Sequence, residues 1–424
     1  MPDEYFFPLY SLFHHNVYHS DNLFSFNTKN LLNQEENGSK TDIHTLAKII
    51  YDTVVINLNS YHDNEVSLTL TGGMDSRLIL ACLLKAGLKP NCFTYGNPES
   101  LDIIMAKKIA KKYNLKFHNV VNKEPSKEWY YKWVIETIKR DNGNSHLHRA
   151  HRTAAIAEHI SEYSPKILFT GHMGGEGLRG LTYNNYFASP FFELVNEGKM
   201  PLGTAVSEIL KNYYVKHDSF HNDTLIDKVK KLSWMCDTRI NNKFRFLYDL
   251  VAKIHHAQDI RLFKSYGLKV IPVYLQEEYL NALFNSEFNF LTKREGFLRK
   301  IQNPSVYCKI VQITYPDLLD DLLTNGFTPN EYLKGLWYYI PVKILRKSYQ
   351  KRIFPATFSY GKWYEEFIRE HAHNIDPWIW DHYSMDEYFK SLKKNDHRTD
   401  EGYWHKFSNP VFFDLVNKYR TGKI

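Results

Sequence analysis

The chain has few cysteines and lacks long apolar runs. Its 424 residues include four cysteines, Cys82, Cys92, Cys236 and Cys308, and no two of them form a CxxC pair. This spacing excludes a cysteine zinc motif and a disulfide framework, so we expect buried free thiols in a reducing cytoplasm. No run of about 18 apolar residues occurs, which excludes a transmembrane helix. The chain starts acidic, without a charged segment followed by an apolar one, so we expect no signal peptide.

A basic tail and an arginine-rich tract are also missing. The 54 lysines and arginines exceed the 47 acidic residues, and the resulting net charge of +7 is mild for this length. It fits an anionic substrate, and we expect neither a nucleic acid nor a membrane as a partner. Aromatic residues, by contrast, are abundant at 15% of the chain. They are enough to fill a large core or to line a groove for a ring or a peptide.

Short β-rich runs alternate with helical patterns in the first half of the chain. The runs that we predict as strands lie at 65–70, 91–96, 116–121 and 166–170. This alternation predicts an α/β fold with a parallel, doubly wound sheet. Beyond about residue 200 the pattern is helical, without clear strands. We therefore expect an N-terminal extension at 1–44, an α/β core at 45–200 and a helical C-terminal part at 201–424.

A glycine turn joins the first predicted strand to a helix in the stretch LTLTGGMDSRLILACLLKAG, residues 68–87. Backbone N–H groups of such a turn can surround an anion, and the helix N-terminus adds partial positive charge. Gly72 and Gly73 supply the backbone freedom that the turn needs. The stretch matches neither a Walker A loop nor a GxGxxG fingerprint.

An acid, Asp75, lies inside this anion site. A carboxylate beside a phosphate is repelled unless a cation lies between the two groups. Asp75 therefore indicates Mg²⁺, and with it a nucleotide polyphosphate. The alternative is an ordinary glycine turn in which Asp75 is the N-cap of the helix.

The turn resembles the pyrophosphate loop (PP-loop) of the ATP pyrophosphatase superfamily, whose usual form is SGGxDS. The residues that match are Thr71, Gly72, Gly73, Asp75 and Ser76. The stretch at 93–120 resembles the asparagine synthetase-like branch, in which a strand ends in a glycine and the next helix carries an early aspartate, here Gly96 and Asp102. The stretch LFTGHMGGEGLRG at 168–180 resembles the second phosphate-side loop of that branch, and 267–275 resembles a later segment weakly.

This resemblance covers roughly residues 45–310 and implies an adenine nucleotide alpha hydrolase-like fold that binds ATP and Mg²⁺. It implies that the loop at Gly72 and Gly73 grips the β- and γ-phosphates and that Asp75 ligates Mg²⁺. A substrate carboxylate would attack the α-phosphate, pyrophosphate would leave, and an amine would then expel AMP from the acyl-adenylate. The residues that would hold the adenosine at the strand ends are Thr69, Leu70, Tyr95, Gly96, Thr170 and Gly171.

The start of the chain departs from the glutamine-dependent members of this family. Those members open with a nucleophilic cysteine after the initiator Met, whereas this chain has Pro2, and no cysteine precedes Cys82. Only 70 residues precede the glycine loop, too few for a glutaminase domain. We therefore expect no glutamine hydrolysis. The amine would be ammonia, an amino group of another substrate, or ammonia from a separate chain.

The second loop departs from the family at two positions. His172 stands where an acid often acts as general base, and histidine can take that role near neutral pH. Gly175 stands where an aspartate is a metal ligand, and Glu176, one residue along, can replace that carboxylate. We therefore expect Asp75, His172 and Glu176 to be catalytic, and Asp75 and Glu176 to bind the metal. The alternative is that the second ligand is lost and ATP chemistry is impaired.

Basic residues outside these loops have open interpretations. Arg77 either adds a phosphate contact or is a solvated surface residue. The segment HLHRAHR at 146–152 puts His148 and His151 on one helix face, which allows a metal site, a polar face near an anionic substrate, or plain surface. The family also uses a lysine from its C-terminal half near the pyrophosphate. The candidates for it here are Lys293, Arg299 and Lys309.

The residues and the resemblance predict an AMP-forming, ATP-dependent carbon–nitrogen ligase that joins a small-molecule or peptide carboxylate to an amine. Its helical C-terminal part would complete the substrate site. Two other classes stay open: a nucleotide-binding protein that has lost catalysis, and another PP-loop reaction such as thiolation of RNA or a small molecule. Catalytic cysteines would favour thiolation, and none lies near a motif.

Overall fold

The computed structural model describes the chain in separate stretches. They are residues 41–58, 65–121, 123–141, 147–163, 165–179, 256–286, 299–346, 360–393 and 401–424, together with 199–201, 204, 214, 216 and 288. Most of the expected N-terminal extension lies outside these residues, and so do Cys236 and Lys293.

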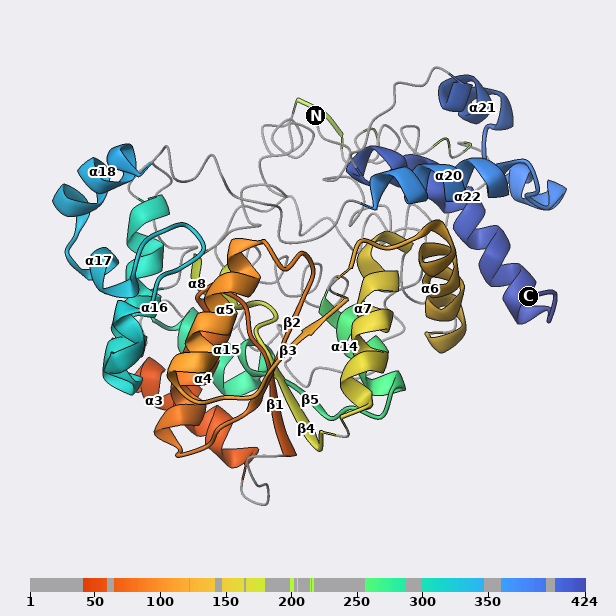
Figure 1. Ribbon diagram of the computed structural model, residues 1–424. Coiled ribbons are helices and arrows are strands. Elements are labelled where there is room, and N and C mark those ends of the chain that lie inside the picture. The colour runs from red at the N-terminus through yellow and green to blue at the C-terminus, as the bar shows by residue number, and fades with distance from the viewer. Residues whose placement is uncertain are drawn as a thin grey trace.

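Five parallel strands form one sheet in the order β3-β2-β1-β4-β5 (Figure 1). Their bounds are β1 Val66–Thr69, β2 Asn91–Tyr95, β3 Phe117–Val120, β4 Ile167–Thr170 and β5 Val270–Pro272. The first four strands lie inside the four predicted runs, which confirms the prediction of an α/β fold with a parallel sheet. The order and the all-parallel pairing are consistent with a Rossmann-like or nucleotide alpha hydrolase-like fold.

Strand β5 corrects the expectation that the chain is wholly helical beyond residue 200. It spans three residues and pairs with β4 at the edge of the sheet. Three residues are too few for an alternating pattern to show in the sequence. Pro272, which cannot donate to a ladder, is tolerated because the strand is an edge strand. The sheet therefore takes its last strand from the part of the chain in which no strand was expected.

Both faces of the sheet are covered by helices (Figure 1). The chain passes from β1 to β2 to β3 in one direction and then returns across β1 to reach β4 and β5. Because crossovers between parallel strands are right-handed, the two directions place their helices on opposite faces. Strand β4 is buried along its whole length, and β1 is buried at three of its four positions. Such burial is expected for a sheet that is covered on both sides.

The helices of the two faces form separate layers. Those of one layer are α3 Ile43–Ile56, α4 Asp75–Lys85, α5 Leu101–Lys112, α15 Glu277–Phe284 and α16 Arg299–Thr314 (Figure 1). Those of the opposite layer are α6 Lys127–Arg140, α7 Leu147–Ser161 and α14 Ala257–Ser265. This arrangement confirms the prediction of a doubly wound sheet.

The rest of the described chain is helical, and its elements beyond residue 200 confirm the prediction of a helical C-terminal part. Its elements are α8 Gly174–Arg179, η6 Val273–Leu275, η8 Pro316–Asp320, α17 Pro329–Leu333, α18 Leu336–Leu345, α20 Gly361–Ala372, η9 Pro377–Asp381, α21 Met385–Lys393 and α22 Glu401–Arg420. Within the part of the chain that the structure describes, no helix combines the length and the apolar character that crossing a membrane requires.

Helix α4 is buried on both sides. Its residues from Ser76 to Leu83 are all buried, because the sheet lies on one side and α3 and α16 pack on the other. The helix ends before Gly87, whose φ of +79° lies in the left-handed region that glycine adopts readily. Gly87 is therefore the residue at which the helical conformation stops.

The cysteines within the described stretches, Cys82, Cys92 and Cys308, are free and buried, as predicted. Burial raises the pKa of each of these thiols to about 12. At neutral pH they are therefore protonated and pack as small apolar side chains rather than acting as nucleophiles.

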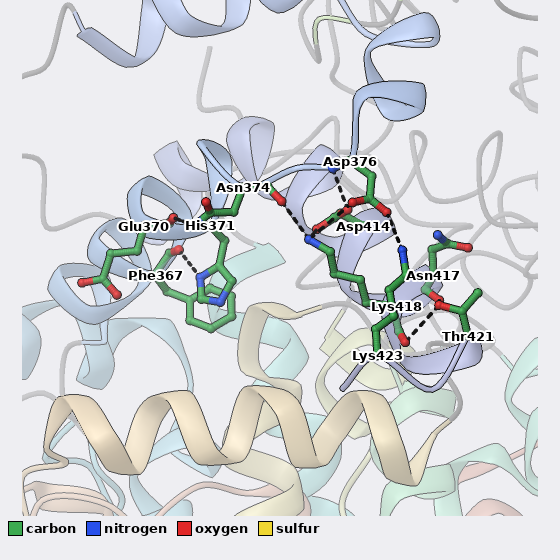
Figure 2. A network of polar contacts seen from close by, with 10 residues as sticks. All are labelled: Phe367, Glu370, His371, Asn374, Asp376, Asp414, Asn417, Lys418, Thr421 and Lys423. Atoms are coloured by element: carbon green, nitrogen blue, oxygen red, sulfur yellow. Dashed lines mark hydrogen bonds and ion pairs between the residues drawn. The ribbon is translucent and has the colours of Figure 1, made fainter.

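A polar network holds the end of the chain against the segment that follows helix α20 (Figure 2). The buried Asp414 carboxylate accepts the Asp376 backbone N–H at 2.9 Å and forms an ion pair with Lys418. Lys418 also donates to the Asn374 carbonyl oxygen at 2.8 Å, and Lys423 pairs with Asp376 at 3.5 Å. Because α22 also packs on α6 and α7, the network anchors the C-terminal helices to one layer of the α/β core.

Arg77 is a charged side chain in the core. It is fully buried on α4, and its guanidinium donates to the carbonyl oxygens of Asp321 and Leu322, the latter at 2.7 Å. Burial lowers the pKa of this guanidinium to about 10, so it stays charged at neutral pH. Arg77 is therefore neither a phosphate contact nor a surface residue, which corrects both alternatives. It ties α4 to the turn at 321–326 that follows η8.

We expect Arg77→Met to lower the free energy of unfolding by about 2–4 kcal/mol, because two backbone carbonyl groups lose a charged donor. Unfolding in urea measures the change. Lys48→Met is the matched control, since Lys48 is an exposed member of an i,i+4 ion pair with Asp52, and its loss should cost less than about 1 kcal/mol. Equal losses in the two variants would contradict a structural role for Arg77.

Candidate functional site

The carboxyl edge of the sheet has a switch point between β1 and β4. These strands are neighbours, but the crossover that leaves β1 and the one that leads to β4 lie on opposite faces. A crevice at such a point is the usual ligand site of an open α/β sheet. The predicted site residues all lie at this edge, at the ends of β1, β2 and β4 or in the segments after them: Thr69, Leu70, Thr71, Gly72, Gly73, Asp75, Ser76, Tyr95, Gly96, Thr170, Gly171, His172 and Glu176.

The loop after β1 is shaped by hydrogen bonds to nearby side chains. The N–H of Thr71 donates to the Ser76 hydroxyl at 3.0 Å, and the N–H of Gly73 donates to the Thr71 hydroxyl at 3.2 Å. The N–H of Gly72 donates to the Asp102 carboxylate at 3.2 Å. These bonds fix the loop. The N–H groups left for an anion are those in the first turn of α4, which a helix cannot pair within itself.

Asp75 joins the loop after β1 to the loop after β4. The N-cap of α4 is Met74, not Asp75, so the alternative of Asp75 as N-cap is wrong. A Cβ added at Gly174 would lie 2.9 Å from Asp75 Cγ, and one added at Gly171 would lie 3.3 Å from Asp75 Cβ. Only glycine permits so close an approach at position 174. The Tyr274 hydroxyl donates to the Asp75 backbone oxygen at 2.7 Å, so η6, which follows β5, also contacts this residue.

A buried phenol lies near Asp75. Tyr279 on α15 is fully buried, and its hydroxyl has no hydrogen-bond partner among the residues that the structure describes. The hydroxyl lies 3.7 Å from the position that a Cβ would take at Gly177 of α8. Burial and the Asp75 charge together raise the pKa of this phenol, which therefore stays protonated. An unsatisfied buried hydroxyl beside a glycine loop is a group that a bound anion or water would complete.

The described residues supply one carboxylate for a cation at this place. Asp75 faces the second loop, Asp102 accepts the Gly72 N–H, and the side chain of Glu176 lies outside the described part. In that part, no group of three or more His, Cys, Asp or Glu side chains is arranged to hold a metal ion. Mg²⁺ commonly combines one or two protein carboxylates with phosphate oxygens and water. The residues present fit Mg²⁺ that arrives with a nucleotide.

His172, the predicted base, has a polar partner at each ring nitrogen. Nδ1 lies 2.8 Å from the Thr170 hydroxyl, and Nε2 lies 3.4 Å from one Asp259 carboxylate oxygen. The other Asp259 oxygen accepts the Thr153 hydroxyl at 2.7 Å. The end of β4 and α14 therefore contact the ring, and α7 contacts Asp259 behind it.

The negative charge beside His172 is that of Asp259, which faces Nε2 of the ring. Burial would raise the pKa of Asp259, but hydrogen bonds from His172 and Thr153 outweigh it, and the pKa lies below its ordinary value. The ring centroid of His256 lies 5.2 Å from that of His172, and burial lowers the pKa of His256 to about 3. At neutral pH the Asp259 carboxylate is therefore ionised, and His256 is neutral.

The turn after His172 carries backbone strain. Met173 is buried and has a φ of +69°, a region that residues other than glycine seldom adopt. Glycines flank the turn at Gly171 and Gly174, yet the strained position itself is a methionine. Strain of this kind persists where the surrounding structure fixes the backbone, and it gathers at functional sites. The turn at 171–174 therefore has the character of a site loop.

Residues 147–152 of the basic segment lie on α7, and Arg152 reaches the same edge. The Arg152 guanidinium lies 5.6 Å from the ring centroid of Tyr95, at the end of β2. The side chain of His148 lies outside the described part. His151 is buried, so it is not a surface residue. The rings around His151 are those of Trp129, Tyr130 and Tyr360.

Some residues of this site were not anticipated from the sequence. They are Thr153, His256, Asp259 and Tyr274. Tyr274 lies in the stretch at 267–275 that weakly resembles the family, which was the one available signal. Asp259 lies 87 residues beyond His172, so only the fold brings the two together. Of the basic candidates for the pyrophosphate, Lys309 is exposed on α16, and the side chain of Arg299 lies outside the described part.

We expect Gly72→Ala to destabilise the protein. A Cβ at Gly72 would lie 2.5 Å from Thr324 Cγ2 and 3.0 Å from Met105 Cβ, so the turn at 321–326 must shift, at a cost of about 1–3 kcal/mol. Thermal unfolding measures the loss, with Gly73→Ala as the milder control. The double variant Gly72→Ala/Thr324→Ser should recover part of the loss, because serine lacks the clashing methyl group. No recovery would show that Thr324 is not the obstacle.

Stability should fall as the pH is lowered from about 6.5 to about 3, in part through His256. Its folded pKa of about 3 lies below the ordinary value of 6.5, so the unfolded chain binds a proton in this window that the folded chain does not. The stabilisation is fully present above pH 6.5 and is lost as the pH falls. Between about pH 7 and pH 4, the midpoint temperature of thermal unfolding should fall less steeply in His256→Gln than in the exposed control His44→Gln. Equal slopes in the two variants would show that His256 does not contribute to this pH dependence.

A comparison of the chain with protein-family models finds no match, and a comparison with curated proteins finds none either. What the molecule itself establishes is the fold class, an α/β domain with a parallel, doubly wound sheet followed by a helical C-terminal region. The polar and charged groups of the candidate site lie between the ends of β1 and β4.

Proposed function

We propose that the protein is an ATP-dependent, AMP-forming synthetase. It activates a carboxylate as an acyl-adenylate and passes it to an amine, as asparagine synthetase-like enzymes do. The observation that carries this proposal is the contact of Asp75, in the glycine loop, with Gly174 of the second loop. The contact gathers an acid, a helix N-terminus and two glycine loops at one switch point, which suits a polyphosphate with Mg²⁺.

In this proposal the N–H groups in the first turn of α4 hold the β- and γ-phosphates, and Gly72 and Gly73, which carry no side chain, let the phosphates approach the loop. Mg²⁺, when bound, neutralises negative charge on the polyphosphate and so favours the departure of pyrophosphate. Asp75 is its protein ligand, and Glu176 on α8 is the second carboxylate. The adenosine lies along the strand ends at Thr69, Leu70, Tyr95, Gly96, Thr170 and Gly171.

His172 takes the proton that the amine loses. As the amine nitrogen attacks the activated carbonyl carbon, a C–N bond forms and the bond to AMP breaks, and the nitrogen sheds a proton. The His172 side chain is 18% exposed, so its ring is partly accessible from solvent. The strained turn at Met173 holds the ring at the end of β4, where the acyl group and the amine would meet.

The amine is ammonia, an amino group of a second substrate, or ammonia from a separate chain. We place the reaction in the cytoplasm.

The helical C-terminal part contributes the turn at 321–326, where the Thr324 N–H donates to the Gly72 carbonyl oxygen at 3.3 Å. Thiolation has less support, because the cysteines of the described stretches are all buried and none lies at the carboxyl edge.

A second candidate function is nucleotide binding without turnover. Two observations favour it: Gly175 stands where the family has an acid, and the Gly72 N–H is already paired with Asp102. This candidate has its own signature in solution. ATP would bind without release of pyrophosphate, and Glu176→Gln would leave its affinity unchanged.

The test of the proposed function is the pair of products formed from ATP. With Mg²⁺, ammonia or hydroxylamine, and a panel of carboxylic acids, the protein should release AMP and pyrophosphate. Asp75→Asn should lower turnover about 100-fold or more with unchanged thermal unfolding, because an amide is a poor substitute for a carboxylate at Mg²⁺. Asp52→Asn, an exposed acid on α3, should leave turnover unchanged. Release of ADP and phosphate would overturn the proposal.

A further inference from the structure

We propose that Asp259 is a positioning residue for His172: it fixes the ring proton on Nε2 and leaves Nδ1 as the nitrogen that accepts the proton of the amine. The amine step rests on the proposed function. The arrangement of the ring, in contrast, is a property of the protein without any substrate, so it can be measured separately.

The contacts of Asp259 aim one carboxylate oxygen at the ring. Its Oδ1 accepts from the Thr153 hydroxyl at 2.7 Å, and its Oδ2 lies 3.4 Å from His172 Nε2. A carboxylate only accepts, so Thr153 must be the donor and is not free to turn toward another group. The Asp259 side chain is 26% exposed and that of His172 is 18% exposed, so both are partly accessible from solvent.

The chemistry of the carboxylate selects the tautomer of the ring. An ionised carboxylate cannot donate a hydrogen bond, so the Nε2 that faces Asp259 must carry the hydrogen. Nδ1 then holds the lone pair, and the Thr170 hydroxyl, 2.8 Å away, donates to it. The third group beside the ring, His256, is neutral at pH 7 and does not repel a positive charge on His172.

In the amine step, the amine nitrogen loses one proton, which His172 accepts. The amine nitrogen forms a bond to the carbonyl carbon, the carbon–oxygen bond to AMP breaks, and its electron pair leaves with AMP. One N–H proton of the amine passes to Nδ1 of His172. The imidazolium that results faces the Asp259 carboxylate, which stabilises the charge until the proton returns to solvent.

The same helix offers a control for a merely structural role. Helix α14 is also tied to the end of α6 by an ion pair in which Arg261 Nε lies 3.1 Å from Asp141. Asp141 is buried, as a structural acid would be, but it does not contact His172 in the described structure. Asp141→Asn therefore weakens the seating of α14 without removing the partner of the ring.

Nitrogen-15 spectra of the histidine rings test the proposal in the protein without substrate. The signal of His172 is the one that disappears in His172→Gln. In the unaltered protein at about pH 8.5 the ring should be mainly the Nε2–H tautomer. Asp259→Ala should convert it to a mixture, Asp259→Glu should keep it in part, and Asp141→Asn should leave it as it is. An unchanged tautomer in Asp259→Ala, or an equal change in Asp141→Asn, would overturn the assignment.

A second measurement separates the two halves of the reaction. It uses an acid that supports exchange of pyrophosphate into ATP, with hydroxylamine as the amine probe. Asp259→Ala should keep the exchange rate within about threefold and lower hydroxamate formation about 100-fold or more. Equal loss of both would overturn the positioning role. Absence of pyrophosphate exchange in the unaltered protein would count against the proposed function. The nitrogen-15 spectra of the His172 ring would still decide whether Asp259 positions it.

Discussion

The close contact between Asp75 and the glycines of the second loop is the constraint on which the carboxyl edge depends. Position 174 has no room for a side chain because Asp75 fills that space, and Gly171 leaves little more. The contact is possible only if β4 lies next to β1, and that neighbourhood requires the chain to return across the sheet after β3. The strand order, the glycines at positions 171 and 174 and the location of the site therefore all follow from one packing requirement.

The helical C-terminal part is tied to this edge by polar contacts rather than by apolar packing alone. Arg77 reaches two carbonyl groups of the turn at 321–326, and Thr324 of the same turn bonds to the Gly72 backbone. Tyr274, which lies in η6 directly after β5, donates a hydrogen bond to the backbone oxygen of Asp75. Both loops are thus held in place before any ligand arrives, and electrostatic catalysis needs such preorganisation.

The sequence predicts the parts of this molecule whose signals are local. Four strands and the glycine loop each follow from a few adjacent residues. Strand β5 is too short to show a period, and Arg77 is indistinguishable from a surface arginine until its partner, 244 residues away, is in place. Asp259 belongs to no motif for the same reason. The roles of His172 and Glu176 come from their positions in a loop and remain predictions about chemistry.

The late arrival of β5 has a consequence for biosynthesis. About 100 residues separate the end of β4 from the start of β5. At about 5–20 residues per second, translation leaves β4 with one bare edge for roughly 5–20 seconds. Three of the four residues of that edge, Ile167–Phe169, are apolar, and all four are buried in the finished sheet, so the nascent chain briefly displays a template for pairing with foreign strands. The yield of this protein in a cell would then depend on how well chaperones shield β4 during that interval.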